Sequence, residues 1–160
     1  MARDKENTLI LELKGGPVVI ALRPDLAPEH VARIKELTRK GFYDGVVFHR
    51  VIPDFMAQTG DPTGTGSGGS DLPDLKAEFS AEKHKRGTVS AARTNNPNSA
   101  NSQFFICFAD APWLDRQYSV WGQVIEGMEH VDAIKKGDGS SGAVSGAPDK
   151  ILKMRVEADA

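Results

Sequence analysis

Residues 48–61 read FHRVIPDFMAQTGD, and this stretch decides how the whole sequence is interpreted. The segments 46–51 and 55–59, at its two ends, are rich in apolar and β-branched residues and flank a Pro-Asp pair typical of turns. They predict two short strands joined by a tight connection. Arg50 and Gln58 stand within these strands, so polar side chains interrupt an otherwise apolar pattern.

Similar patterns recur on both sides of this stretch. Alternating or continuous apolar segments bounded by Gly, Pro, Ser and Asn predict six more strands, at residues 8–14, 18–22, 88–92, 103–108, 118–124 and 150–158. Helical spacing of apolar residues predicts a helix of about three turns from Pro28 to near Lys40, and a shorter one through Met128 and Ile134. Segments rich in Gly, Ser and other polar residues predict loops at residues 60–75, 93–101 and 137–148.

Eight short strands and two helices predict a mainly β domain. Eight strands with alternating faces are enough to close a barrel filled with side chains, and the helices would cover its open mouths. Strand count alone leaves a two-sheet sandwich as the alternative. No repeat or linker divides the chain, so residues 1–160 are expected to form one domain, with residues 1–6 as a flexible N-terminal tail.

Composition narrows the class of protein. Hydrophobic residues make up 39% and charged residues 26% of the 160 residues, as in a globular domain rather than a disordered chain. The apolar runs are far shorter than the ~20 residues that cross a bilayer, and the N-terminus lacks the apolar core of a signal peptide. A cytoplasmic protein without a membrane partner is therefore expected. With 20 basic and 22 acidic residues, a net charge of −2 and no basic block, nucleic acid is not expected as a partner either.

The sequence gives little support to a cofactor-dependent enzyme or to a hydrolase. Residues 64–69, GTGSGG, match the dinucleotide-binding pattern GxGxxG, but prolines on both sides exclude the strand-turn-helix context that this pattern requires. The four histidines show no metal-ligand spacing, and His30 and His130 are expected on solvated helix faces. Cys107 is the only cysteine, which fits a reducing compartment, and is interpreted as a buried, inert thiol. No cofactor and no metal are expected.

Polar groups stand among aromatic residues in three segments, residues 48–61, 93–106 and 113–118. Taken singly, Phe55, Met56 and Phe105 are more often core residues than site residues, and Arg50 alone would usually be a surface charge. Alternation puts His49 opposite to Arg50, so one of the two faces inward or into a cleft. Composition and spacing alone therefore indicate no more than a generic apolar pocket.

Taken together, FHRVIPDFMAQTGD, GTGSGGS, SQFFI and WLD, in this order and at these intervals, resemble the cyclophilin family, from about Thr8 to the last predicted strand. The resemblance implies a closed eight-stranded antiparallel β-barrel capped by two α-helices, with a shallow groove on one outer face rather than in the lumen. Carried over position by position, it implies catalytic roles for Arg50, Phe55 and Gln58, and substrate-binding roles for Met56, Gly66, Ala92, Arg93, Thr94, Gln103, Phe105, Trp113, Leu114 and Tyr118.

The activity implied by the resemblance is peptidyl-prolyl cis/trans isomerisation, without a cofactor, of proline-containing peptides and folding protein clients. It also implies a cyclosporin-type cyclic peptide as a ligand, and a monomer is expected. A non-catalytic chaperone or scaffold that binds proline-containing peptides is the alternative, and intact Arg50, Phe55 and Gln58 favour the enzyme. A nucleotide-dependent oxidoreductase, suggested only by the glycine-rich loop, comes third.

Three features depart from the pattern that the family often shows. Residues 90–93 read SAAR where many members read SMAN, so Arg93 adds a charge at the groove rim. The loop that follows is slightly longer than in many eukaryotic members. Tyr118 replaces a histidine that is common at the groove edge, which keeps an aromatic side chain and loses a titratable one.

Overall fold

The computed structural model describes residues 4–137, 142–144 and 146–159, so part of the loop expected at residues 137–148 lies outside the described residues. Its strands are β1 (Thr8–Leu13), β2 (Gly16–Leu22), β3 (Arg50–Ile52), β4 (Met56–Thr59), β5 (Thr88–Ala91), β6 (Phe104–Cys107), β7 (Val120–Glu126) and β8 (Lys153–Val156). The helices are α1 (Pro28–Arg39), α2 (Met128–Asp132) and the short 3-10 helices η1 (Lys5–Asn7), η2 (Pro112–Leu114) and η3 (Glu157–Asp159). The predicted strands and the two α-helices are confirmed, with small differences at their ends. Within the described ranges, no helix is long and apolar enough to traverse a membrane.

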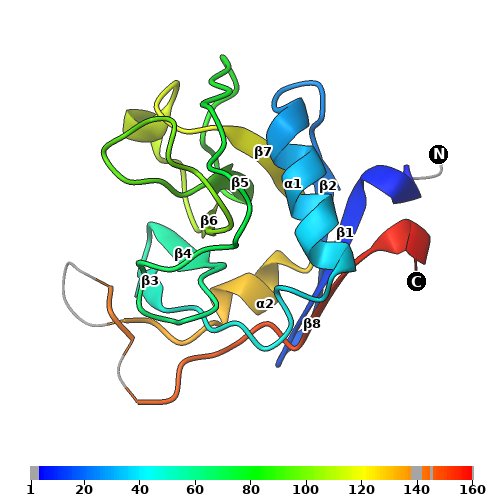
Figure 1. The fold of residues 1–160 in the computed structure, drawn as a ribbon. Coiled ribbons are helices and arrows are strands. Elements are labelled where there is room, and N and C mark those ends of the chain that lie inside the picture. The colour runs from blue at the N-terminus through cyan, green and yellow to red at the C-terminus, as the bar shows by residue number, and fades with distance from the viewer. Residues whose placement is uncertain (1–3, 138–141, 145, 160) are drawn as a thin grey trace.

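The strands form one antiparallel sheet that curls into a barrel (Figure 1). Its order is β3-β4-β6-β5-β7-β2-β1-β8, so β3 and β8 are the edges of the ladder. The segments that precede these two edges bridge the gap between them: the N–H of Gly45 donates to the carbonyl oxygen of Ile151 (2.7 Å), and the N–H of Phe48 donates to that of Asp149 (2.8 Å). These bonds satisfy backbone groups that an open edge would expose, and they close the barrel without a regular ladder at this seam.

The seam explains one wrong strand boundary. The sequence predicts a strand at residues 46–51, but β3 begins only at Arg50. Val47 instead forms an isolated bridge with Lys150, across the seam of the barrel. Because the two partners are far apart in the sequence, the local apolar pattern cannot distinguish this bridging segment from a regular strand.

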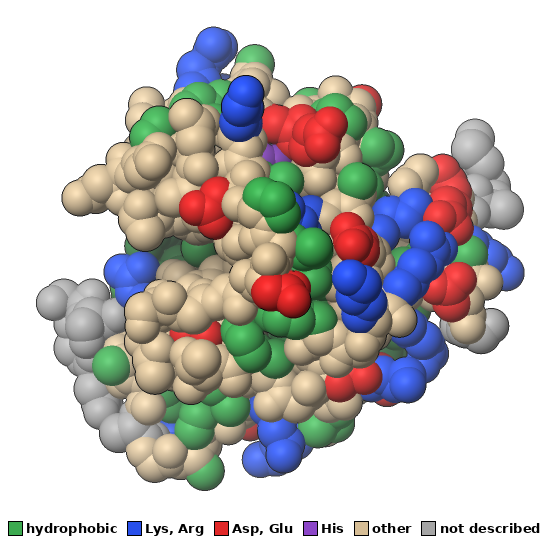
Figure 2. Space-filling view, in the orientation of Figure 1, with side chains coloured by type: hydrophobic (Ala, Val, Ile, Leu, Met, Phe, Trp, Pro, Cys, Tyr) green, Lys and Arg blue, Asp and Glu red, His purple; other side chains and the backbone are tan. Residues whose placement is uncertain are grey.

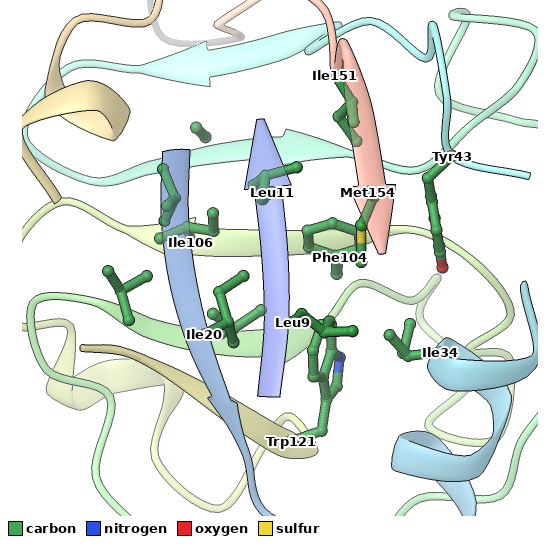
Figure 3. Packing of buried hydrophobic residues seen from close by; sticks show 14 of the residues in the cluster. Leu9, Leu11, Ile20, Ile34, Tyr43, Phe104, Ile106, Trp121, Ile151 and Met154 are labelled. Atoms are coloured by element: carbon green, nitrogen blue, oxygen red, sulfur yellow. The ribbon is translucent and has the colours of Figure 1, made fainter. Parts of the chain in front are cut away.

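Alternation along the strands separates the barrel interior from its outer face. Leu9, Ile20 and Ile106, from three different strands, point inward and are fully buried (Figure 3). Phe104 packs edge-on against Trp121, with ring centroids 5.3 Å apart. Side chains thus fill the interior, as the sequence predicts for a small barrel, and the outer face is the one available to a substrate.

The N-terminus of α1 is capped by a residue that is distant in the sequence. Its N-cap residue, Ala27, makes no side-chain hydrogen bond, and the carboxylate of Glu78 accepts instead from the backbone N–H of Glu29 (3.2 Å) and of His30 (2.8 Å). The same carboxylate lies 2.5 Å from Nδ1 of His30. The expectation that His30 faces solvent is therefore wrong, because its side chain is buried against Glu78. Burial lowers the pKa of His30, and Glu78 opposes this shift only in part.

His130, also expected on a solvated face, is half-buried against the turn between β1 and β2. A Cβ atom on Gly16 would come within 2.6 Å of Nε2 of His130, and Gly16 has a φ of +145°. A glycine is needed there both for its backbone conformation and for the space that the imidazole occupies.

Charged side chains hold the two ends of the chain against α1. Glu6 pairs with Lys35 (2.7 Å) and Arg39 (2.9 Å), and Arg39 also pairs with Asp159 (2.9 Å). Figure 2 shows acidic and basic side chains intermixed on this side of the molecule, near the termini labelled in Figure 1. In the segment expected as a flexible tail, residues 4–6 thus make defined contacts, while residues 1–3 lie outside the described residues.

Candidate active site

Four residues on neighbouring strands form a row on the outer face of the barrel. The register sets Arg50 of β3 opposite Gln58 of β4. Gln58 is in turn opposite Phe105 of β6, which is opposite Ser90 of β5. Directly opposed residues of antiparallel strands point to the same face, whereas alternate positions such as Ile106 point into the barrel core. Register therefore places a guanidinium, an amide and an aromatic ring side by side.

A second apolar cluster, separate from the barrel core, lies on this outer face. Its buried members are Met56, Phe105, Cys107, Ala111 and Leu114, and Ile52, Phe55, Ala92 and Tyr118 pack against them. The cluster adjoins an open recess of about 90 Å³, here called the small recess, which is lined by Arg50, Phe55, Met56, Gln58, Ala92, Arg93, Phe105, Leu114 and Tyr118. Apolar walls with a few polar groups at one side suit a small apolar ring attached to an amide.

Hydrogen bonds connect the guanidinium of Arg50 to the glycine-rich loop at residues 64–69. Nη1 of Arg50 donates to Oε1 of Gln58 (3.2 Å), and Nε2 of Gln58 donates to Oε1 of Gln103 (2.9 Å). Nε2 of Gln103 donates in turn to the carbonyl oxygens of Gly66 (3.0 Å) and Gly68 (2.9 Å). The oxygen of each amide accepts a hydrogen bond from one neighbour, and its nitrogen donates to the next. This series of hydrogen bonds orients Arg50 at the edge of the small recess.

The glycine-rich loop is folded around Asp61, whose side chain is fully buried. Its Oδ1 accepts from the N–H of Thr63 (2.8 Å), and its Oδ2 accepts from the N–H groups of Thr65 (3.1 Å), Gly66 (2.6 Å) and Gly68 (3.1 Å). Burial alone would raise the pKa of this carboxyl, but the hydrogen bonds from Thr63, Gly68 and Gly66 outweigh it and hold the pKa well below its usual range. No helix follows this loop, so the strand-turn-helix context of a dinucleotide-binding pattern is not formed at residues 64–69, and the loop wraps an internal carboxylate instead.

A larger recess of about 500 Å³, here called the large recess, adjoins the small one. Gly66, Thr94 and Gln103 lie in its lining. The two recesses share Gln58, Ala92 and Arg93. A peptide with an apolar ring in the small recess therefore has room for its neighbouring residues in the large recess.

A buried polar layer lies behind Phe105, and the sequence did not reveal it. Nε2 of His84 lies 2.7 Å from Oγ of Ser90, and its Nδ1 lies 3.2 Å from Oδ1 of Asp115. The imidazole stacks on the ring of Phe105 with centroids 6.2 Å apart, and it meets Tyr118 edge-on. Because a carboxylate only accepts, we assign the ring proton to Nδ1, so that Nε2 accepts from the Ser90 hydroxyl. Burial lowers the pKa of His84 in spite of the opposing hydrogen bond to Asp115.

Ser90, His84 and Asp115 are the residue types of a nucleophilic triad, but they lie beneath the groove rather than at its surface. The Ser90 side chain is fully buried, so its hydroxyl is not presented to a substrate. The layer instead supports the aromatic wall of the small recess from behind. His84, Ser90 and Asp115 follow no recognisable spacing in the sequence, and only the fold brings them together.

The structure brings most of the predicted site residues to the two recesses. Every residue that lines the small recess belongs to the predicted set. Trp113 lines neither recess: its side chain is 63% exposed, and its ring centroid is 5.5 Å from that of Phe55, at the outer rim. Asp61 and the layer of His84, Ser90 and Asp115 are the supporting residues that the sequence reasoning missed.

The structure also shows which of His49 and Arg50 faces the groove, and whether Cys107 is buried. Of His49 and Arg50, Arg50 faces the small recess, whereas His49 is half-buried, and burial lowers its pKa. Cys107 is fully buried, as expected, and burial raises the pKa of its thiol to about 12, so the thiolate is disfavoured at neutral pH. Within the residues that the structure describes, no three His, Cys, Asp or Glu side chains are grouped as metal ligands.

Comparison with known proteins identifies the class to which this barrel and groove belong. The family model described as "Cyclophilin type peptidyl-prolyl cis-trans isomerase/CLD" matches residues 8–156. The chain therefore belongs to the cyclophilin-type peptidyl-prolyl cis-trans isomerase family, as its motifs predict. It is 58% identical over 170 residues to a Brucella suis protein named "Probable peptidyl-prolyl cis-trans isomerase", covering 99% of this chain and 86% of that one. It is 41% identical over 121 residues to a peptidyl-prolyl cis-trans isomerase of Schizosaccharomyces pombe, covering 74% and 78% of the two chains.

Solved structures agree with the fold. A cyclophilin from Hirschia baltica superimposes with a TM-score of 0.88 at 30% identity, covering 100% of this chain and 77% of that one. A cyclophilin-type isomerase of Cryptosporidium parvum, whose structure was determined in the presence of the dipeptide Ala-Pro, has a TM-score of 0.84 at 27% identity, covering 93% and 98% of the two chains. The predicted cyclophilin-like barrel is thereby confirmed.

Proposed function

We propose that this chain accelerates cis/trans rotation about Xaa-Pro peptide bonds, with the prolyl ring in the small recess and the adjacent residues in the large one. The position of the Arg50 guanidinium carries the proposal. It is held by Gln58 at the edge of a recess whose other walls include Met56, Phe105 and Leu114. A prolyl ring against these apolar side chains brings its nitrogen to the polar edge of the recess.

The chemistry requires stabilisation of a twisted amide and no transfer of atoms. An Xaa-Pro bond resists rotation because resonance gives its C–N bond partial double-bond character, with a barrier of about 18–20 kcal/mol. When the bond twists, resonance is lost and the prolyl nitrogen regains a lone pair that accepts a hydrogen bond. A guanidinium is permanently charged and presents its N–H donors in a fixed plane. Arg50 therefore donates to the nitrogen of the twisted state and has little to bind in the planar ground state, which is preferential stabilisation of the transition state.

The other residues of the groove divide into two roles. Phe55 and Gln58 complete the catalytic set: Phe55 closes the recess beside the prolyl ring, and Gln58 orients Arg50 and, together with the backbone N–H of Arg93, binds the rotating carbonyl. The remaining predicted residues contact the peptide. A relative whose structure was determined in the presence of Ala-Pro supports proline-containing peptides as the ligands. The proposal includes folding protein clients as substrates and a monomeric protein, without a cofactor, in the cytoplasm, where a single cysteine is compatible with reducing conditions.

A protease-coupled isomerisation assay on a short Xaa-Pro peptide tests the proposal directly. We expect turnover by the parent protein and a large loss of turnover in Arg50→Ala, with peptide binding retained. Peptide binding without turnover by the parent protein would instead identify a binding module. Arg23→Ala is a matched control, because Arg23 lines neither recess and pairs with Asp25 and Glu82.

A further inference from the structure

Arg93 lies where the two recesses meet. With Gln58 and Ala92, it is one of the residues that line both of them. When a prolyl ring occupies the small recess, the adjoining peptide residue that enters the large recess must pass the Arg93 side chain. The chemical character of this side chain therefore bears on which peptides fit.

Three hydrogen bonds and two aromatic rings hold the Arg93 guanidinium in one place. Nε and Nη2 donate to the carbonyl oxygen of Gln117 (3.0 and 2.7 Å), and Nη1 donates to that of Thr94 (2.9 Å). Its Cζ lies over the ring of Tyr118, 4.6 Å from the centroid, and 6.0 Å from the centroid of Phe79. Carbonyl acceptors and aromatic faces orient the plane of a guanidinium. A peptide thus meets a cation that is already positioned, so little side-chain entropy is lost on binding.

These contacts position the charge without neutralising it. The hydrogen bonds end on carbonyl oxygens, which carry no formal charge, and a guanidinium has more N–H groups than these bonds use. Asp74 lines only the large recess, where its Oδ1 accepts from Nδ2 of Asn101 (3.1 Å). The junction of the recesses is therefore cationic.

We propose that Arg93 determines substrate specificity, an inference that rests on the proposed isomerisation of Xaa-Pro bonds in this groove. Arg93 favours peptides in which the residue that enters the large recess, close to the proline, has an acidic side chain. A carboxylate fits the planar donors of a guanidinium, whereas a lysine at the same peptide position meets a like charge. Arg93 is half-buried and solvent screens it in part, so the preference for Glu over Lys should be about 3- to 10-fold in kcat/KM.

The test uses three sets of peptides, and each set varies one position: the residue immediately before the proline, the one before that, or the residue immediately after the proline. Within each set, this position is Glu, Gln or Lys. Cis/trans exchange measured by NMR needs no coupling protease, so protease specificity does not enter. In one set we expect kcat/KM to fall in the order Glu, Gln, Lys, and the ratio to shrink toward one as salt is raised, because exposed charges are screened. Arg93→Gln should abolish the ratio while its amide still reaches a carbonyl acceptor. Arg93→Lys should keep most of it.

Lys153→Gln is the matched control, since it removes the same charge from an exposed position on β8. An Arg93→Gln protein with the parent ratio, or a parent protein without any preference in all three sets, would overturn the inference. Absence of exchange with every peptide, the neutral Gln peptides included, would instead contradict the proposed isomerase. In that case the same spectra still give peptide affinities, and equal affinities for the Glu and Lys peptides would also refute the role of Arg93.

Discussion

Arg50 and Gln58 face each other across the β3–β4 pair, and Nη1 of Arg50 donates to Oε1 of Gln58 over 3.2 Å. Gln58 is tied to Gln103 in the same way, and Gln103 is tied to the backbone of the glycine-rich loop. The orientation of the proposed catalytic donor thus depends on a loop that folds around the buried carboxylate of Asp61. The strand register brings Arg50 close to Gln58, and the hydrogen bonds of Gln58 and Gln103 orient the guanidinium.

Replacing Arg50 should reveal its role most clearly. Arg50→Ala should lower kcat/KM by one to three orders of magnitude, or about 1.4–4 kcal/mol of transition-state stabilisation. Ground-state peptide affinity should change much less, because the apolar walls remain. Arg50→Lys should restore little, since an ammonium on a flexible stem lacks the planar fork of donors. Kinetics and a thermal melt are measured together, and a folded Arg50→Ala protein with parent turnover would exclude the catalytic role.

Asp61→Asn should loosen the glycine-rich loop. An amide in place of the carboxylate turns one of the two acceptor oxygens into a donor that faces backbone N–H groups, so the expected destabilisation is about 1–3 kcal/mol. Hydrogen exchange of the Gly66 and Gly68 amides should become faster, and kcat/KM of the folded protein should fall as Gln103 loses its fixed acceptors. Asp71→Asn, an exposed position in the same loop region, is the control. Unchanged exchange in Asp61→Asn would show that the carboxylate does not organise the loop.

Turnover should depend little on pH between about 6 and 8, because no group with a pKa in that range is assigned to the chemistry. His49, the nearest imidazole in the sequence to Arg50, has its pKa lowered by burial, and His49→Gln should remain active. The measurement is kcat/KM across this range for both proteins. A bell-shaped profile, or loss of turnover in a folded His49→Gln protein, would indicate a proton transfer that the mechanism lacks.

Stability should decline as the solution is acidified below about pH 6.5, the usual pKa of histidine in an unfolded chain. Burial lowers the pKa of His30 and of His84 in the folded protein, so below pH 6.5 the unfolded chain binds protons that the folded chain does not. Linkage then favours unfolding as the pH falls toward the lowered values, and above pH 6.5 this contribution is constant. Thermal melts from about pH 8 to 5 measure this dependence of stability on pH. His30→Gln should melt at lower temperature with a shallower acid dependence, and an unchanged dependence would count against this assignment.

Trp113 should report binding of a cyclosporin-type cyclic peptide. Its indole is 63% exposed at the rim beside Phe55, and it offers an N–H donor and a flat apolar wall to a rigid ligand. Trp121 is fully buried in the barrel core, so a change in emission on titration would come from Trp113. Trp113→Phe should lose both the signal and part of the affinity. An unchanged spectrum at micromolar ligand would argue against binding.

The sequence by itself determined the secondary structure and most of the groove lining. Apolar alternation and the positions of Pro and Gly are local signals, and they located eight strands and two helices. The motifs around Arg50, Phe105 and Leu114 resemble one family closely enough that all the residues lining the small recess could be named in advance.

Only the tertiary structure decided which polar groups support that groove. The burial of His30 against Glu78, the folding of the glycine-rich loop around Asp61, and the contact of His84 with Ser90 all join residues that no local pattern links. The physical reason is that a sequence pattern records which side chains prefer to leave water, whereas a buried polar group is stable only beside its hydrogen-bond partner. That partner is chosen by how the strands and loops come together in the closed barrel.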